Sequence, residues 1–177
     1  MPPDRIAPVI DKLVGTLQDE AAALDDLNAL LAQQVEAVRR GSADTLKDLA
    51  GQTHEVTAAL NELRKKRVRQ MRLLSRVLQV EADDLSVASL VAALERQENA
   101  GGSQRLADVR QTVQERAHES RHRGETLQFA LEYAAGLNRE LLFAMRDAAD
   151  GDETQTYTAA GQSEAAAAPR SFLNATG

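Results

Sequence analysis

Two histidines four residues apart are the residues of this chain whose types and spacing could do chemistry. His118 and His122 enclose Glu119 in the pattern H-E-x-x-H. On a helix, two histidines at this spacing face the same side and can bind one zinc ion, with the glutamate acting as general base. The pattern is therefore the one candidate in this sequence for a metal-dependent hydrolase.

A catalytic zinc site also needs a third protein ligand and a cleft that shapes the substrate. Glu140 lies downstream of the pair, but in a straight helix it would be roughly 27 Å from His122, and no turn signal separates them. Charged residues surround the two histidines, as on the solvated face of a helix. We therefore expect no catalytic residues, no metal ligands, no cofactor and no enzymatic activity, with adventitious metal binding at most.

A basic run in the middle of the chain is the second candidate site. Seven cationic residues occur in thirteen positions without an acidic residue: Arg64, Lys65, Lys66, Arg67, Arg69, Arg72 and Arg76. Nucleic-acid binding needs such a footprint, but base stacking needs aromatic side chains nearby, and none are present. The run favours the outer face of a coiled coil, near Asp11, Asp19 and Glu20 of a neighbouring helix. Arg67 differs because its heptad position places it in the seam, the apolar stripe along which the helices pack. A carboxylate partner is therefore expected for it.

The aromatic residues are confined to the C-terminal part of the chain. All five follow residue 128: Phe129, Tyr133, Phe143, Tyr157 and Phe172. At 100° per residue, the first three fall opposite a stripe of Leu127, Leu131, Leu141 and Met145. The pattern fits either a central helix that buries both faces or a ridge that binds a partner.

The amino-acid composition predicts that the candidate residues described above lie on helices. The 177 residues are 43% hydrophobic but only 3% aromatic, with no Trp, so Ala, Leu and Val dominate the apolar content and favour helices. The formal net charge of −6 discourages non-specific binding to nucleic acid. The absence of Cys fits a reducing cytoplasm, and no apolar run is long enough for membrane insertion. We expect a cytoplasmic protein.

Apolar residues recur at spacings of three and four over residues 4–40 and again over 46–78. Gly41-Ser42-Ala43-Asp44 separates the two segments, which predicts an antiparallel hairpin. Asp84 or Ser86 could be the N-cap of a short helix. This helix is expected to end at residues 99–103. A last long helix spans about 104–149, and the small or polar seam residues Ser120, Gly124 and Asn138 should weaken its packing or define its register.

The sequence therefore predicts an all-α fold, a long antiparallel coiled-coil-like bundle of three long helices plus a short one. The bundle domain is expected over residues 1–149. Residues 150–177 form a low-complexity segment with too little apolar surface to offset its ordering entropy, so we expect a disordered tail.

Three stretches of the sequence resemble the FlgN-type flagellar export chaperones. They are residues 60–67 (LNELRKKR), 123–127 (RGETL) and 156–162 (TYTAAGQ). The resemblance covers nearly the whole chain and implies a cytoplasmic chaperone that keeps hook-associated proteins unpolymerised and delivers them to the type III export gate. It also implies client contacts at Phe129, Tyr133, Leu137, Leu141 and Phe143, and a gate contact at Tyr157.

A second hypothesis from another class remains open. The same seams could belong to a generic coiled-coil scaffold or adaptor that has no export role and oligomerises through them. For the chaperone we expect a monomer or a weak homo-oligomer. The two hypotheses differ in whether hook-associated proteins bind and in how strongly the mass depends on concentration.

Overall fold

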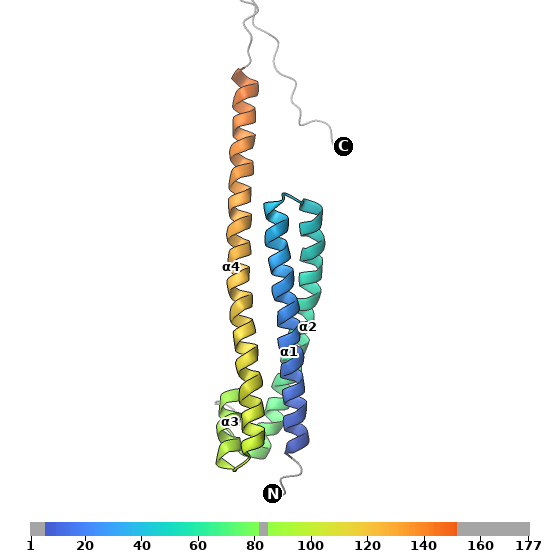
Figure 1. Cartoon of the computed structure of the whole chain (residues 1–177), viewed down its shortest axis with the longest axis vertical. Coiled ribbons are helices and arrows are strands. Elements are labelled where there is room, and N and C mark those ends of the chain that lie inside the picture. Colours follow the sequence, from blue (N-terminus) through green and yellow to red (C-terminus); the bar gives the residue numbers. More distant parts are fainter. Residues whose placement is uncertain (1–5, 82–84, 152–177) are drawn as a thin grey trace, which may run out of the picture. The chain divides into compact units, whose positions relative to one another are not determined.

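The computed structural model describes residues 6–81 and 85–151, and in these ranges it contains helices and no strand (Figure 1). The helices are α1 (Ala7–Arg39), α2 (Ala43–Leu78), α3 (Val87–Arg96) and α4 (Ala100–Gly151). The predicted all-α fold with three long helices and one short helix is confirmed. Most of the predicted tail, from residue 152 onward, lies outside the described residues.

Helices α1 and α2 form the predicted antiparallel hairpin and lie side by side (Figure 1). Gly41 makes the turn with φ +66°, a left-handed conformation that favours glycine. Near the turn, Gln34 Nε2 donates to Thr53 Oγ1 at 2.8 Å. Farther from it, Arg67 of α2 reaches Glu20 of α1. The order of these contacts along the two helices shows their antiparallel pairing.

The main core lies where α3 joins the long helices. Its fully buried apolar side chains come from all four helices: Ile10, Leu13, Leu17, Leu74, Leu90, Leu94 and Leu106. Helix α3 begins with a capping box, in which Ser86 Oγ accepts from the backbone N–H of Ser89 and Ser89 Oγ accepts from that of Ser86. Of the two predicted caps, Ser86 is thus confirmed, whereas Asp84 lies outside the described residues.

Helix α4 begins four residues earlier than predicted, at Ala100. Asn99 Oδ1 accepts a hydrogen bond from the backbone N–H of Gly102 at 3.0 Å and satisfies one of the free donors of the first turn. The segment that was expected to be a loop is therefore a capped helix start. A β-carbon at Gly102 would lie 2.9 Å from Ile10 Cδ1, so this glycine permits α4 to approach α1, whereas open space surrounds the corresponding position at Gly101.

Within the first of two compact units, Met1–Glu132, α4 runs parallel to α1. Arg105 pairs with Asp11 at 2.8 Å, and Arg116 pairs with Asp25 at 3.0 Å. Farther along, Ser120 Oγ donates to Oδ1 of the buried Asn28 at 2.8 Å. The prediction that a polar residue at position 120 defines the register agrees with this contact, because Asn28 is satisfied only when Ser120 lies beside it.

The predicted seam of α4 does not stay buried to its end. Val113 is the last buried apolar residue of this helix, and Leu131, Leu141 and Met145 are all exposed. In the register set by Asn28 and Ser120, α1 ends at the residue that corresponds to Leu131. Helix α4 has 52 residues and α1 has 33, and the exposed seam residues Leu141 and Met145 belong to the second unit, Tyr133–Gly177.

Replacement of Gly102 by alanine tests the close approach of α1 and α4. We expect Gly102→Ala to lower the free energy of unfolding by about 1 kcal/mol, because the added methyl group meets the fully buried Ile10 and the capping Asn99. Gly101→Ala is the matched control, since open space surrounds its β-carbon position, and it should be neutral or stabilising. Urea denaturation followed by circular dichroism measures both, and equal effects of the two substitutions would contradict the prediction.

Candidate protein-binding surface

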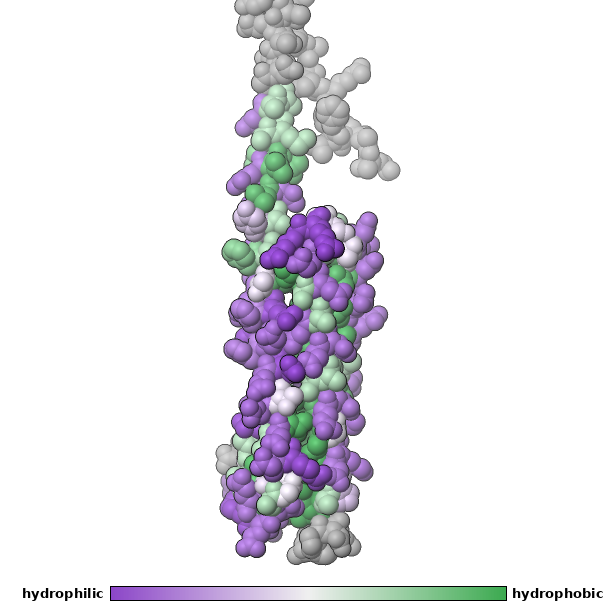
Figure 2. All heavy atoms as spheres, in the orientation of Figure 1, coloured by the Kyte–Doolittle hydropathy of each residue, from purple (hydrophilic) through white to green (hydrophobic). Residues whose placement is uncertain are grey.

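Exposed apolar side chains gather on the part of α4 that belongs to the second unit, Tyr133–Gly177. We call this set the α4 apolar segment, and its residues are Tyr133, Leu137, Leu141, Leu142, Phe143 and Met145. Phe143 is 57% exposed and Met145 69%. Figure 2 shows the hydrophobic side chains on this length of helix. Soluble proteins rarely expose such a contiguous apolar surface unless it binds a partner.

The α4 apolar segment covers most of the circumference of its helix. At 100° per residue, Tyr133 and Phe143 lie on one side and Leu142 and Met145 on the other, with Leu137 and Leu141 between them. Helices that are apolar nearly all round are normally buried. Burial of both faces was one of two interpretations of this pattern, and in the second unit the described residues on both faces are exposed.

The structure places the predicted site residues as follows. Tyr133, Leu137, Leu141 and Phe143 lie together in the α4 apolar segment, whereas Phe129, which is 71% exposed, belongs to the first unit. Tyr157 lies outside the described residues. Their roles as contacts for a partner stay predictions.

Sequence analysis missed two residues of this surface as site residues, Leu142 and Met145. Leu142 falls outside the aromatic stripe and the leucine seam, and Met145 was assigned to a buried seam. The nearly unbroken apolar stretch from Leu141 to Met145 was a usable signal, because a solvated helix face would interrupt it with charged residues.

Both histidines of the H-E-x-x-H pattern lie exposed on α4, whereas Glu119 is partly buried. Glu119 Oε1 accepts a hydrogen bond from Arg123 Nε at 2.6 Å, and this bond, together with the positive charge of Arg123, holds the pKa of Glu119 below its ordinary value. A general base at neutral pH needs the opposite shift. No group of three or more potential ligands that could hold a metal ion occurs in the described part of the chain. The geometry gives Glu119 an ion-pair partner one turn farther along its own helix.

The basic run meets carboxylates of α1, as predicted for Arg67. Arg67 Nη1 donates to both carboxylate oxygens of Glu20, at 3.0 and 2.8 Å, and Glu20 is 2% exposed. Two further cations of the run approach the same stretch of α1, Arg64 to Glu20 at 3.7 Å and Lys66 to Asp19 at 4.0 Å. Asp11, which was expected near the run, pairs with Arg105 of α4.

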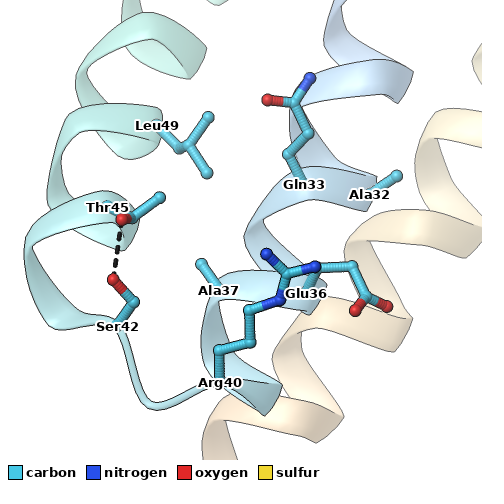
Figure 3. Close-up of a pocket in the computed structure, with 8 residues that line it drawn as sticks. All are labelled: Ala32, Gln33, Glu36, Ala37, Arg40, Ser42, Thr45 and Leu49. Atoms are coloured by element: carbon cyan, nitrogen blue, oxygen red, sulfur yellow. Dashed lines mark hydrogen bonds between the residues drawn. The ribbon is translucent and has the colours of Figure 1, made fainter.

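A shallow hollow lies between α1 and α2 beside their turn (Figure 3). Ala37 and Leu49 line it from the two helices, and Arg40 extends along one side. Ser42 Oγ donates to Thr45 Oγ1 at 2.7 Å at its rim. No pair of acid and base or nucleophile and base lies within hydrogen-bond reach among its lining residues, so the hollow offers no catalytic arrangement.

The fold and the exposed segment of α4 together define a class of protein, a helical bundle that acts by binding other proteins. A family model described as FlgN protein matches residues 1–165, nearly the whole chain. The chain therefore belongs to the FlgN family of flagellar export chaperones, which confirms the resemblance of the three sequence stretches. A search of the curated proteins and a search of the solved structures found no match. None of the described helices is both long and apolar enough to cross a membrane.

Proposed function

We propose that this protein is a cytoplasmic type III export chaperone for the hook-associated proteins that join hook and filament. The α4 apolar segment binds the helical end of such a client and keeps the client unpolymerised. The client leaves this segment when it is delivered to the export gate. Tyr157 is proposed to contact the gate. We further propose that the protein has no enzymatic activity and needs no cofactor.

The observation that carries this proposal is the exposure of large apolar side chains on α4 in a chain of the FlgN family. Tyr133, Leu141 and Phe143 each leave more than half of their surface in water. Burial of apolar surface contributes about 25 cal/mol per Å², and aromatic anchors dominate binding energy at protein interfaces. A client helix that covers this segment would remove the apolar surface of both molecules from water.

Helix-in-groove recognition is the mechanism that fits this surface. An amphipathic client helix would place its own apolar residues, at spacings of three and four, between those of α4. A single helix can cover only part of the circumference of another. The two apolar sides of the α4 segment therefore suit a client that contributes more than one helix.

Co-purification with hook-associated proteins encoded in the same genome tests the proposal. The full-length chain and a version that ends at Ala149 would be compared. Binding by both forms supports a client site on α4 and leaves residues 150–177 for docking at the gate. Binding by the full-length chain alone would move the client site into those residues, and binding by neither would refute the export role.

Phe143→Ala is expected to weaken client binding by more than about 1 kcal/mol, because it removes an exposed aromatic anchor. The melting temperature should not change, since Phe143 is 57% exposed and is no part of either core cluster. Isothermal titration with a purified client and thermal melting by circular dichroism measure the two quantities. Equal client affinity for the variant and the wild-type chain would contradict this role for Phe143.

A generic coiled-coil scaffold is the second candidate function. The observation that favours it is the exposure of Leu131, Leu141 and Met145 at seam spacing, which could pair with a second copy. Sedimentation equilibrium over a wide concentration range would distinguish the two functions. A scaffold should form stable oligomers without binding hook-associated proteins, whereas the chaperone should be a monomer or a weak oligomer that binds them.

A further inference from the structure

An apolar groove runs along the C-terminal part of α2, within the first unit. Two adjoining hollows form it, with volumes of 430 and 500 Å³, and both are lined by Val68, Met71 and Leu85. Ligand pockets in proteins begin at about 300 Å³, so each hollow can accept large side chains. Val68 at its edge is 38% exposed, whereas Met71 is buried at 7%. The edge of this groove is therefore aliphatic and open.

Exposed arginines border the same groove. Arg72 and Arg76 border one hollow and Arg110 the other. In residues 6–81 and 85–151, no carboxylate lies within 4.0 Å of Arg72 or Arg76, whereas Arg64, Lys66 and Arg67 of the same run all meet carboxylates of α1. Among the described residues, the intramolecular ion pairs therefore account for the first part of the basic run, and neither Arg72 nor Arg76 takes part in them.

The spacing of these residues describes the partner that would fit. Arg72 and Arg76 are one helical turn apart, about 6 Å along α2, and both are exposed. Val68 and Met71 lie beside the arginines on the groove side of α2. A partner helix with carboxylates three or four residues apart could pair with both arginines. Leucines beside those carboxylates would meet the apolar side chains of the groove.

Nucleic acid is the less suitable occupant of this surface. It requires positive charge along a phosphate backbone and aromatic side chains for unpaired bases, and it gains little from an aliphatic floor. The lining residues of both hollows include no aromatic residue.

We propose that this groove, the α2 arginine groove, binds an acidic amphipathic helix of a second partner protein. The carboxylates of that helix pair with Arg72 and Arg76, and its leucines contact Val68 and enter the hollows that Met71 and Leu85 line. This surface belongs to the first unit, whereas the α4 apolar segment belongs to the second. Binding at the groove is therefore a property separate from client binding.

Fluorescence anisotropy with the full-length chain tests this proposal. The probe is a labelled synthetic peptide of about four helical turns, with leucines along one face and glutamates beside them. A second peptide has glutamine in place of every glutamate. We expect the glutamate peptide to bind about tenfold more tightly than the glutamine peptide, and the difference to shrink as salt is added.

The variant Arg72→Gln/Arg76→Gln should bind the glutamate peptide about tenfold more weakly than the wild-type chain. Arg39→Gln/Arg40→Gln is the matched control, because those arginines are also exposed but lie at the α1–α2 turn. Its affinity for the peptide should equal that of the wild-type chain. Both variants replace exposed side chains, and their circular dichroism spectra and melting curves verify that they are folded.

Several outcomes would overturn the proposal. They are absence of peptide binding to the wild-type chain, equal affinity of the groove variant and the wild-type chain, and equal affinity for the two peptides. A duplex DNA or an anionic vesicle that binds in an Arg72- and Arg76-dependent manner, where the peptide does not, would assign the groove to that ligand instead. Client binding by the groove variant should be unchanged, so failure here is distinguishable from failure of the export role.

Discussion

The double variant Leu141→Asp/Phe143→Asp is expected to lower the affinity for a hook-associated client at least about 100-fold, which corresponds to about 2.7 kcal/mol. Two apolar anchors are lost, and each aspartate would bring an unpaired charge into the interface, where its desolvation is costly. Leu141 is 61% exposed and Phe143 57%, so in the free protein both new carboxylates remain in water. Titration calorimetry against the purified client measures the loss.

Arg139→Asp is the matched control for this experiment. Arg139 is exposed on the same length of α4 but lies on the strip of helix between the two apolar sides. It should reduce client affinity much less than the double variant, although it also introduces a negative charge. If both variants bound the client as the wild-type chain does, the α4 apolar segment would not be the client site.

The second large effect is expected at the ion pair between α1 and α2. Arg67→Leu should lower the free energy of unfolding by about 2 kcal/mol, because it leaves the carboxylate of Glu20 buried with only Arg64 nearby, at 3.7 Å. The reciprocal variant Glu20→Leu should cost less, since the Arg67 side chain is 25% exposed and its guanidinium can turn toward water. The two single substitutions are therefore predicted to be unequal.

The combined variant Glu20→Leu/Arg67→Leu separates pairing from packing. Two leucines of suitable volume bury no charge, so the double variant should be close to the wild-type chain in stability and more stable than Arg67→Leu. Urea denaturation of all three variants completes the cycle. Lys65→Ala, which removes an exposed pair with Glu62 at 2.7 Å, serves as control and should change stability by less than about 0.5 kcal/mol. Additive effects of the two leucine substitutions would show that the pair is not coupled.

The sequence determined the local features of this protein. Helix periodicity is a property of residues three and four apart, so the helices and the turn at Gly41 could be predicted without a partner for any of them. The seam position of Arg67 likewise predicted a carboxylate partner, and Glu20 provides it. Motif similarity covering most of the chain indicated the FlgN family, and the family match agrees.

The tertiary structure decided which apolar stripes are buried. The leucine seam of α4 has the same spacing before and after Leu131, yet Leu106 and Val113 are buried whereas Leu141 and Met145 are exposed. Leu106 and Val113 belong to the core of the first unit, where the register between α1 and α4 depends on contacts such as Asn28 with Ser120, whereas Leu141 and Met145 belong to the second unit. Periodicity shows that a stripe needs a partner, but it does not show whether the chain supplies one.

The charged residues of α2 show the same difference between what the sequence pattern predicts and what the packing decides. The basic run reads as a uniform patch in the sequence, but its first residues are neutralised by Asp19 and Glu20 of α1, whereas Arg72 and Arg76 are left facing an apolar groove. Ion pairs depend on distances across helices, and those distances follow from packing that no local pattern encodes. The sequence by itself therefore determined the helices and the family, and only the tertiary structure decided which surfaces remain open to partners.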